Sequence, residues 1–132
     1  MAAELIDSSA LHADRDRSDA NHGRARAYLR RPGARFHTTS EIHWEAYTLA
    51  RRRLGYEPAM EMARALLRSS VITVHRLTAD EEDAIWSVLA EMRGVGLSHA
   101  DASLIVLARR LRVRDVFSFD ADFVAAGLTT VP

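Results

Sequence analysis

Acidic residues that follow short apolar runs are the feature of this sequence that most suggests chemistry. The segment VFSFDADF, residues 116–123, places Asp120 and Asp122 after one such run, and Asp7 ends another, AAELID. Parallel α/β sheets bind ligands at the carboxyl ends of their strands, where the strand order reverses. If these two runs form neighbouring strands, their carboxylates converge. Clustered carboxylates repel one another and require a cation to hold them together.

Two further acids lie on predicted helices that could bring them to the same edge. Glu45 lies roughly one and a half turns into the helix that follows the second predicted strand. Asp101 lies in the first turn of the most apolar predicted helix, whose remainder must be buried. The sequence therefore offers four or five carboxylates for one site.

Each acid also has a structural explanation. The segment SHAD, residues 98–101, has the spacing of a capping box, in which the acid accepts a hydrogen bond from the backbone of the N-cap serine. Asp7 could be an N-cap, Asp120 could begin a turn, and Asp122 could be the acid of a helix's first turn. Glu45 could be the solvated partner of an arginine.

The elements that must position these acids alternate along the chain. Strands are expected within residues 2–7, 34–39, 70–77, 115–119 and 128–132, and helices after residue 8 and within 21–31, 40–55, 56–69, 78–94 and 97–112. Thr38 with Glu41 has capping-box spacing at the start of the third helix, and Thr78 is the expected cap of the fifth. This alternation predicts a three-layer α/β/α domain with a mainly parallel sheet of four to five strands.

Composition limits the class of protein. At 132 residues and with 48% hydrophobic content, the chain is expected to form one compact domain over residues 1–132. Its lack of net charge argues against a general polyanion-binding protein. It has no cysteine, which excludes thiolate ligands and cysteine nucleophiles. Glu4 and Asp7 stand where a signal peptide would be basic, so we expect a cytoplasmic protein.

Four short motifs in this order resemble the PIN domain, and specifically the VapC-type toxin ribonucleases of bacterial toxin–antitoxin pairs. They are LIDSSAL, TTSEIHWE, LSHADA and SFDADF, and they span almost the whole chain. The resemblance implies a parallel sheet between helices, Mg²⁺- or Mn²⁺-dependent endoribonuclease activity, a homodimer, and inhibition by a cognate antitoxin.

The same resemblance implies roles for individual residues. Metal-binding and catalytic acids would be Asp7, Glu45, Asp101 and Asp120, with Asp122 as a fifth metal ligand and the hydroxyls of Ser9 and Ser118 lining the site. Oxygen ligands of this kind suit Mg²⁺ or Mn²⁺, which can activate water and neutralise the charge that develops when an RNA phosphodiester is hydrolysed.

A pocket of carboxylates is also a target for an inhibitor. An arginine guanidinium satisfies two carboxylate oxygens at once, so we expect the antitoxin to insert an arginine into the site. Its C-terminal segment would lie along an apolar groove around Trp44, Tyr47 and Leu49.

Other classes fit less well. A receiver domain needs a lysine at its acidic site, and this chain has none; a haloacid-dehalogenase-type phosphatase needs Asp-x-Asp where this chain has Asp7-Ser8-Ser9. His43 and His99 lie near the acids in sequence, but there is no HExxH motif. The remaining alternative is a PIN module that binds RNA or a partner protein without cutting.

Overall fold

The computed structural model describes residues 2–132, which form a five-stranded parallel sheet between helices. The elements in chain order are β1 (Glu4–Ile6), α1 (Ser8–Arg15), α2 (His22–Leu29), β2 (Phe36–Thr39), α3 (Ser40–Leu54), α4 (Tyr56–Arg68), β3 (Ile72–His75), α5 (Ala79–Glu91), α6 (His99–Leu111), β4 (Asp115–Phe117), the 3₁₀ helix η1 (Ala121–Ala126) and β5 (Thr129–Val131). The predicted order of strands and helices is confirmed. No helix within residues 2–132 is long and apolar enough to cross a bilayer.

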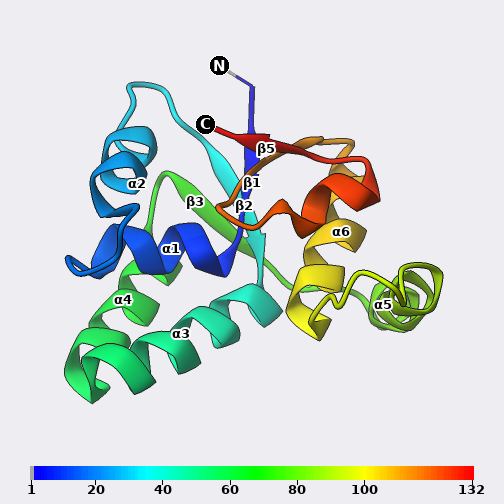
Figure 1. Cartoon of the computed structure of the whole chain (residues 1–132), viewed down its shortest axis with the longest axis horizontal. Helices are drawn as coiled ribbons and strands as arrows, with labels where there is room; N and C mark the ends of the chain where they lie inside the picture. Colours follow the sequence, from blue (N-terminus) through cyan, green and yellow to red (C-terminus); the bar gives the residue numbers. More distant parts are fainter. Residues whose placement is uncertain (1) are drawn as a thin grey trace.

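The strand order is β3-β2-β1-β4-β5, with β1 in the centre. Helices α1 to α4 lie on one side of the sheet, and α5 and α6 lie on the other (Figure 1). The chain therefore leaves β1 toward one face and returns to β4 from the other, so the strand order reverses between these two neighbours. That reversal is where a ligand site is expected in an open parallel sheet.

Apolar strands and one almost fully buried helix make the core. Leu5 and Ile6 of β1 and Val116 and Phe117 of β4 are fully buried, as central strands covered on both faces require. Residues 102–108 of α6 are all buried, because this helix packs against α5, α3 and β2. The first turn of α6 is thereby fixed at the edge of the core, as its apolar sequence predicted.

One predicted helix cap is wrong by a residue. Thr39, and not Thr38, caps α3, and its Oγ1 accepts a hydrogen bond from the backbone nitrogen of Ile42 at 3.0 Å. Thr38 still belongs to β2, where its hydroxyl donates to the carbonyl of Ile6 at 2.8 Å and ties β2 to β1. The capping box expected from Thr38 and Glu41 does not form, whereas the one at Thr78 does.

Two histidines meet on the neighbouring strands β2 and β3. Nδ1 of His37 and Nε2 of His75 are 2.7 Å apart. Burial lowers the pKa of both imidazoles, and for His75 the charges of His37 and Arg110 lower it further while Glu81 opposes them. As the pH falls, the histidines of the unfolded chain bind protons before those of the folded protein, because their pKa is higher. The pair's contribution to stability is therefore complete above about pH 6.5 and is lost as the pH falls below it.

We expect His37→Gln to reduce this acid sensitivity. The fall in melting temperature between pH 7.5 and pH 5 should be smaller in the variant than in the native protein, because one low-pKa imidazole is gone. His99→Gln, at an exposed position, is the control and should keep the native slope. Equal slopes in all three proteins would contradict the effect of the pair.

Candidate active site

Asp7 lies directly after β1 and is the N-cap of α1, as one of the structural explanations predicted. It is 2% exposed; its Oδ1 accepts hydrogen bonds from Ser9 Oγ at 2.7 Å and from the backbone nitrogen of Ala10 at 3.2 Å. Its Oδ2 accepts from Ser118 Oγ at 2.7 Å. The pKa of Asp7 is raised to about 6, mainly by burial and to a smaller extent by the charge of Asp101, while these three hydrogen bonds oppose the shift.

Ser118 joins the ends of β1 and β4. Besides donating to Asp7, its Oγ accepts a hydrogen bond from the backbone nitrogen of Asp120 at 2.9 Å. Asp120 is the N-cap of η1, and its Oδ1 accepts from the backbone nitrogen of Asp122 at 2.9 Å. Because β1 and β4 are paired, the two acids that follow them are brought to the same edge.

Asp101 approaches from the first turn of α6 and forms the capping box that its spacing predicted. Its Oδ2 accepts from the backbone nitrogen of Ser98 at 3.0 Å, and Ser98 Oγ accepts from the Asp101 nitrogen at 3.0 Å. Burial raises the pKa of Asp101, and the charges of Glu45 and Asp120 raise it further. Asp101 therefore lies close enough to Asp7, Glu45 and Asp120 for the carboxylate charges to interact.

Glu45 reaches the edge from α3 and is held by a serine that the sequence did not single out. Its Oε2 accepts a hydrogen bond from Ser8 Oγ at 2.7 Å, which joins α3 to the first residue of α1. The position of Ser8, next to Asp7 at the end of β1, was a signal that it lies near the site. Its partner Glu45 could not be inferred in the same way, because it lies 37 residues away in the sequence.

Asp122 is less closely connected than the other four acids. Only its backbone nitrogen takes part, as the donor to Asp120. Within residues 2–132 its carboxylate makes neither a hydrogen bond nor an ion pair with another side chain. It lies in the first turn of η1, where a carboxylate is also favoured by the orientation of the free backbone N–H groups.

The oxygen donors of these acids suit a hydrated divalent cation. In the described part of the chain, no three His, Asp or Glu side chains lie close enough together to enclose an ion by themselves. Mg²⁺ does not require such a cage, because it keeps several water ligands and is commonly bound by one or two carboxylates together with substrate phosphate. Burial is the main cause of the raised pKa values of Asp7 and Asp101, and the charges of neighbouring acids add to it; a divalent cation would offset both effects.

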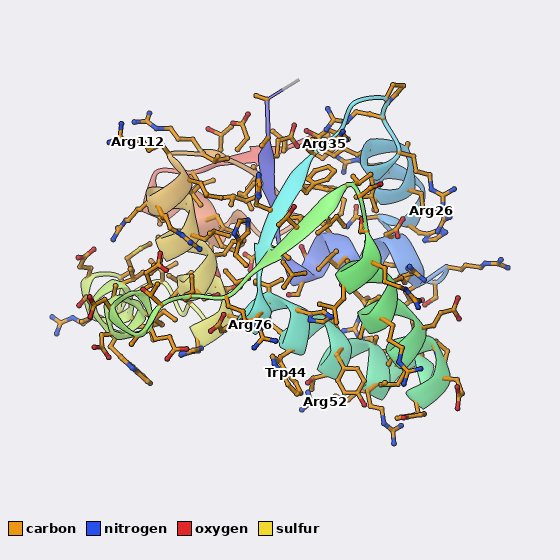
Figure 2. The ribbon with its side chains drawn as sticks, turned by 180° about the vertical axis from the view of Figure 1, so that it is seen from behind. Arg26, Arg35, Trp44, Arg52, Arg76 and Arg112 are labelled. Atoms are coloured by element: carbon orange, nitrogen blue, oxygen red, sulfur yellow. The ribbon has the colours of Figure 1, made fainter. Side chains whose placement is uncertain are left out.

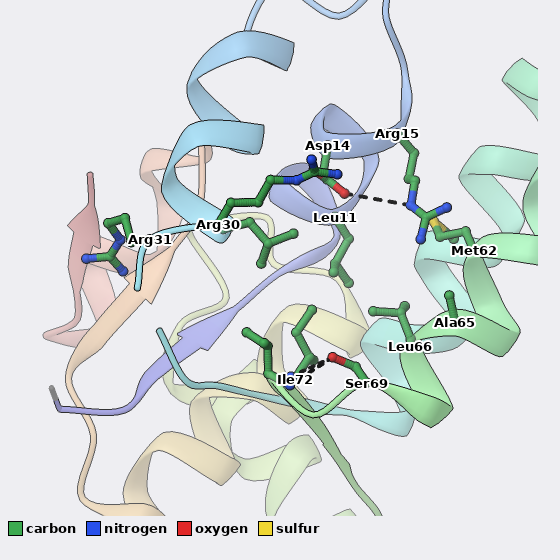
Figure 3. A pocket seen from close by; sticks show the side chains of 12 residues that line it. Leu11, Asp14, Arg15, Arg30, Arg31, Met62, Ala65, Leu66, Ser69 and Ile72 are labelled. Atoms are coloured by element: carbon green, nitrogen blue, oxygen red, sulfur yellow. Dashed lines mark hydrogen bonds and ion pairs between the residues drawn. The ribbon is translucent and has the colours of Figure 1, made fainter. Parts of the chain in front are cut away.

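A separate cavity lies between α1, α2 and α4 and contains none of these acids (Figure 3). It measures about 390 Å³ and is lined mainly by apolar side chains such as Leu11, Met62 and Leu66. Asp14 is buried at its wall, 3.7 Å from both Arg15 and Arg26. Burial raises the pKa of Asp14, and these arginines oppose the shift. The Asp14 carboxylate thus lies between α1 and α2, with Arg15 on one side and Arg26 on the other.

The comparison with protein families decides the class. The family model of the PIN domain matches residues 5–127. The chain belongs to the PIN domain family. The resemblance found in the sequence is thus confirmed. Nucleases of this family use divalent metal ions, in agreement with the oxygen donors of the site.

Individual proteins similar to this PIN domain include a toxin nuclease. The chain is 31% identical over 127 residues to the 23S rRNA-specific endonuclease VapC20 of two Mycobacterium tuberculosis strains, covering 96% of each protein. The crystal structure of M. tuberculosis VapC20, a sarcin-ricin loop cleaving toxin, superposes with a TM-score of 0.90 at 29% identity and covers 98% of both chains. The predicted enzyme class, a PIN-domain nuclease of the VapC toxin type, is confirmed.

More distant structures share the fold alone. VapBC2 from Rickettsia felis, bound to a DNA fragment from its promoter, matches with a TM-score of 0.69 at 10% identity, and covers 98% of both chains. FitAcB from Neisseria gonorrhoeae matches with a TM-score of 0.65 at 16% identity, covering 99% of this chain and 97% of the other.

Proposed function

We propose that this PIN domain is a Mg²⁺- or Mn²⁺-dependent endoribonuclease that acts as the toxin of a toxin–antitoxin pair. The observation that carries the proposal is the set of hydrogen bonds at the point where the strand order reverses: Ser118 joins the Asp7 carboxylate to the backbone of Asp120, and Ser8, next to Asp7, binds Glu45. Carboxylates gathered at one edge of the sheet are costly unless they bind a cation, and a module that only bound RNA would gain nothing from them.

The residues divide into those that would hold the ion and those that orient them. The metal-binding acids would be Asp7, Glu45, Asp101 and Asp120, with Asp122 free to join from η1. When bound, the ion would supply an activated water and charge stabilisation for phosphodiester hydrolysis. Ser9 and Ser118 orient the two oxygens of Asp7, and Ser8 orients Glu45. No covalent enzyme intermediate is needed.

We infer that the substrate is structured ribosomal RNA, because VapC20 is named for cleavage of 23S rRNA and resembles this chain over nearly its whole length. The test is to incubate the purified protein with a synthetic sarcin-ricin stem-loop and with a stem-loop of the same length and a permuted loop sequence. Cleavage should require Mg²⁺ or Mn²⁺, stop with EDTA, and fail with Zn²⁺. Metal-independent cleavage would contradict the proposal, and equal cleavage of both RNAs would reject this substrate.

We further propose that the protein is a cytoplasmic homodimer and that residues 1–132 form a single PIN domain.

We also propose that an antitoxin binds a groove along α3 and α4. This groove measures about 560 Å³ and contains Trp44, Tyr47, Met60 and Leu67; Trp44 is 71% and Leu67 65% exposed. Figure 2 shows Trp44 projecting from α3 with Arg76 nearby. Leu49, which the sequence placed in the same groove, lies instead in a cavity on the other side of α3, beside Ser9.

An antitoxin arginine should be essential for inhibition. We expect one Arg→Ala substitution in the C-terminal segment of the partner, encoded by the neighbouring gene, to restore RNA cleavage, since a guanidinium can pair with two of the carboxylates. Affinity and cleavage should be measured for each arginine variant, with and without added Mg²⁺. If no arginine mattered, and Mg²⁺ had no effect on the complex, inhibition would act through the groove alone.

A further inference from the structure

A cavity of about 210 Å³ lies next to the acids, between α1, the start of α2, α3 and the segment after β4. Its polar and aromatic lining is formed by Ser9, His12, Asp19, Asn21, Arg53 and Phe119. A single hydroxyl joins it to the acids: Ser9 Oγ donates to Asp7 at 2.7 Å and accepts a hydrogen bond from the backbone nitrogen of Phe119 at 3.0 Å. A group bound beside Ser9 in the cavity would therefore be one hydrogen-bonded residue away from the carboxylate of Asp7.

Phe119 offers an aromatic surface at this position. It lies between Ser118 and Asp120 in the sequence, and its half-buried ring packs edge-on against Phe117, with centroids 5.7 Å apart and planes at 72°. The guanidinium of Arg24 lies 5.5 Å from the ring centroid. Aromatic rings and arginine planes are the groups on which proteins stack unpaired RNA bases.

The polar groups around the cavity have few partners in the structure. Asn21 occupies the N-cap position of α2, but its side chain makes no capping hydrogen bond. Within residues 2–132 Arg53 forms no ion pair. His12 is 1% exposed; its Nε2 contacts Asp16 at 2.8 Å, and its Nδ1 has no hydrogen-bond partner in the described chain. Buried polar atoms are normally paired, so an unpaired one beside a cavity calls for an explanation.

We propose that this cavity is a subsite for the base of one unpaired nucleotide adjacent to the cleaved phosphate. The inference rests on the proposed ribonuclease function and adds a source of its sequence preference. Phe119 stacks on the base, the amide of Asn21 hydrogen-bonds to the base edge, and Arg53 and Arg24 contact the flanking phosphates. These two arginines also offset the negative potential of the acids, which would otherwise repel the RNA backbone.

The test combines changes in the protein with removal of the base. The RNA is a stem-loop that the native protein cuts, and its variants each carry one abasic nucleotide on either side of the cut. One of these abasic sites should lower kcat/KM of the native protein about 10-fold or more, in keeping with the strength of base–aromatic stacking. Phe119→Leu should lower kcat/KM on intact RNA by a similar factor and become insensitive to that abasic site. Phe119→Tyr, which keeps the ring, should restore both properties.

Asn21→Ala tests the polar contact separately, because this side chain makes no capping bond whose loss would destabilise α2. It should reduce the discrimination between the four bases at the same position. Tyr56→Leu is the matched control, since Arg51 lies over the Tyr56 ring at the same 5.5 Å but outside this cavity. It should leave rate and base preference unchanged.

RNA affinity in an Asp7→Asn background separates this inference from the proposed function. If the native protein cut no RNA, the function would fail, and the subsite would be judged by affinity alone. The subsite would be supported if Phe119→Leu weakened the binding of intact RNA, and if removal of the base weakened the binding of RNA to the protein with Phe119 by the same factor. The subsite would be overturned if both Phe119→Leu and Asn21→Ala kept the native ratio between intact and abasic RNA, in binding and in cleavage.

Discussion

Replacing Asp7 by asparagine is expected to lower RNA cleavage about 10³-fold while raising the melting temperature of the metal-free protein. Loss of a direct metal ligand removes several kcal/mol of transition-state stabilisation, which corresponds to a factor of this order. The fold should survive, because an asparagine oxygen can still accept from Ser9 and Ala10, and its amide can donate to Ser118. Cleavage rate and thermal unfolding should be measured on the same preparation.

The stability gain has a defined pH dependence. Folding raises the pKa of Asp7 from 3.8 to about 6, so the folded protein holds this proton more tightly than the unfolded chain. The ionised group therefore costs nothing below about pH 4, progressively more as the pH rises to about 6, and a constant amount above it. The shift corresponds to about 1–3 kcal/mol at pH 7, so the melting temperature of Asp7→Asn should exceed the native value by roughly 3–10 °C there.

Asp14→Asn provides the control for this result. Asp14 is also buried and its pKa is also raised, but it lies in the cavity between α1, α2 and α4. Its replacement should raise stability near neutral pH without changing cleavage. Native cleavage rates in Asp7→Asn would show that Asp7 does not bind the catalytic ion, and the assignment of the metal site would be wrong. Absence of cleavage by the native protein itself would instead favour the non-catalytic PIN module.

Local sequence signals were sufficient for the helices and strands. The β-branched run before His75 and the apolar face of α6 gave the correct strand and helix because burial follows directly from residue pattern. The cap of α3 was misplaced because two adjacent threonines have almost the same local chemistry. Only the pairing of β2 with β1 decides that Thr38 is used by the sheet and Thr39 by the helix.

Contacts between distant segments could not be read from the sequence in the same way. That β1 and β4 are neighbours was a condition of the predicted site, and it depends on a chain crossing from one face of the sheet to the other. The bond from Ser8 to Glu45 and the cavity beside Phe119 depend on how α1, α2 and α3 pack together. Such placements follow from tertiary packing, for which a single sequence carries no periodic signal.

Asp101 allows the structural and chemical roles of one carboxylate to be separated. Its Oδ2 already accepts the capping hydrogen bond from Ser98, so the cap is real; the question is whether the carboxylate also serves the site. Within residues 2–132 Oδ1 has no hydrogen-bond partner, and burial, together with the charges of Glu45 and Asp120, raises the pKa of the group. A residue that acted only as a cap would have no need to stand among other acids.

Asp101→Asn should therefore silence cleavage by about 10²- to 10³-fold and change stability by about 1 kcal/mol or less, because asparagine can still accept the bond from Ser98 while its charge is gone. Ser98→Ala makes the reverse change. It removes the hydroxyl that accepts from the Asp101 nitrogen, should cost about 1 kcal/mol of stability, and leaves the carboxylate to bind the ion. Asp101→Asn should thus lose cleavage and nearly keep its melting temperature, whereas Ser98→Ala should keep cleavage and lose melting temperature. An active but destabilised Asp101→Asn protein would restrict Asp101 to capping, and the ion would then have to be held by Asp7, Glu45 and Asp120 without it.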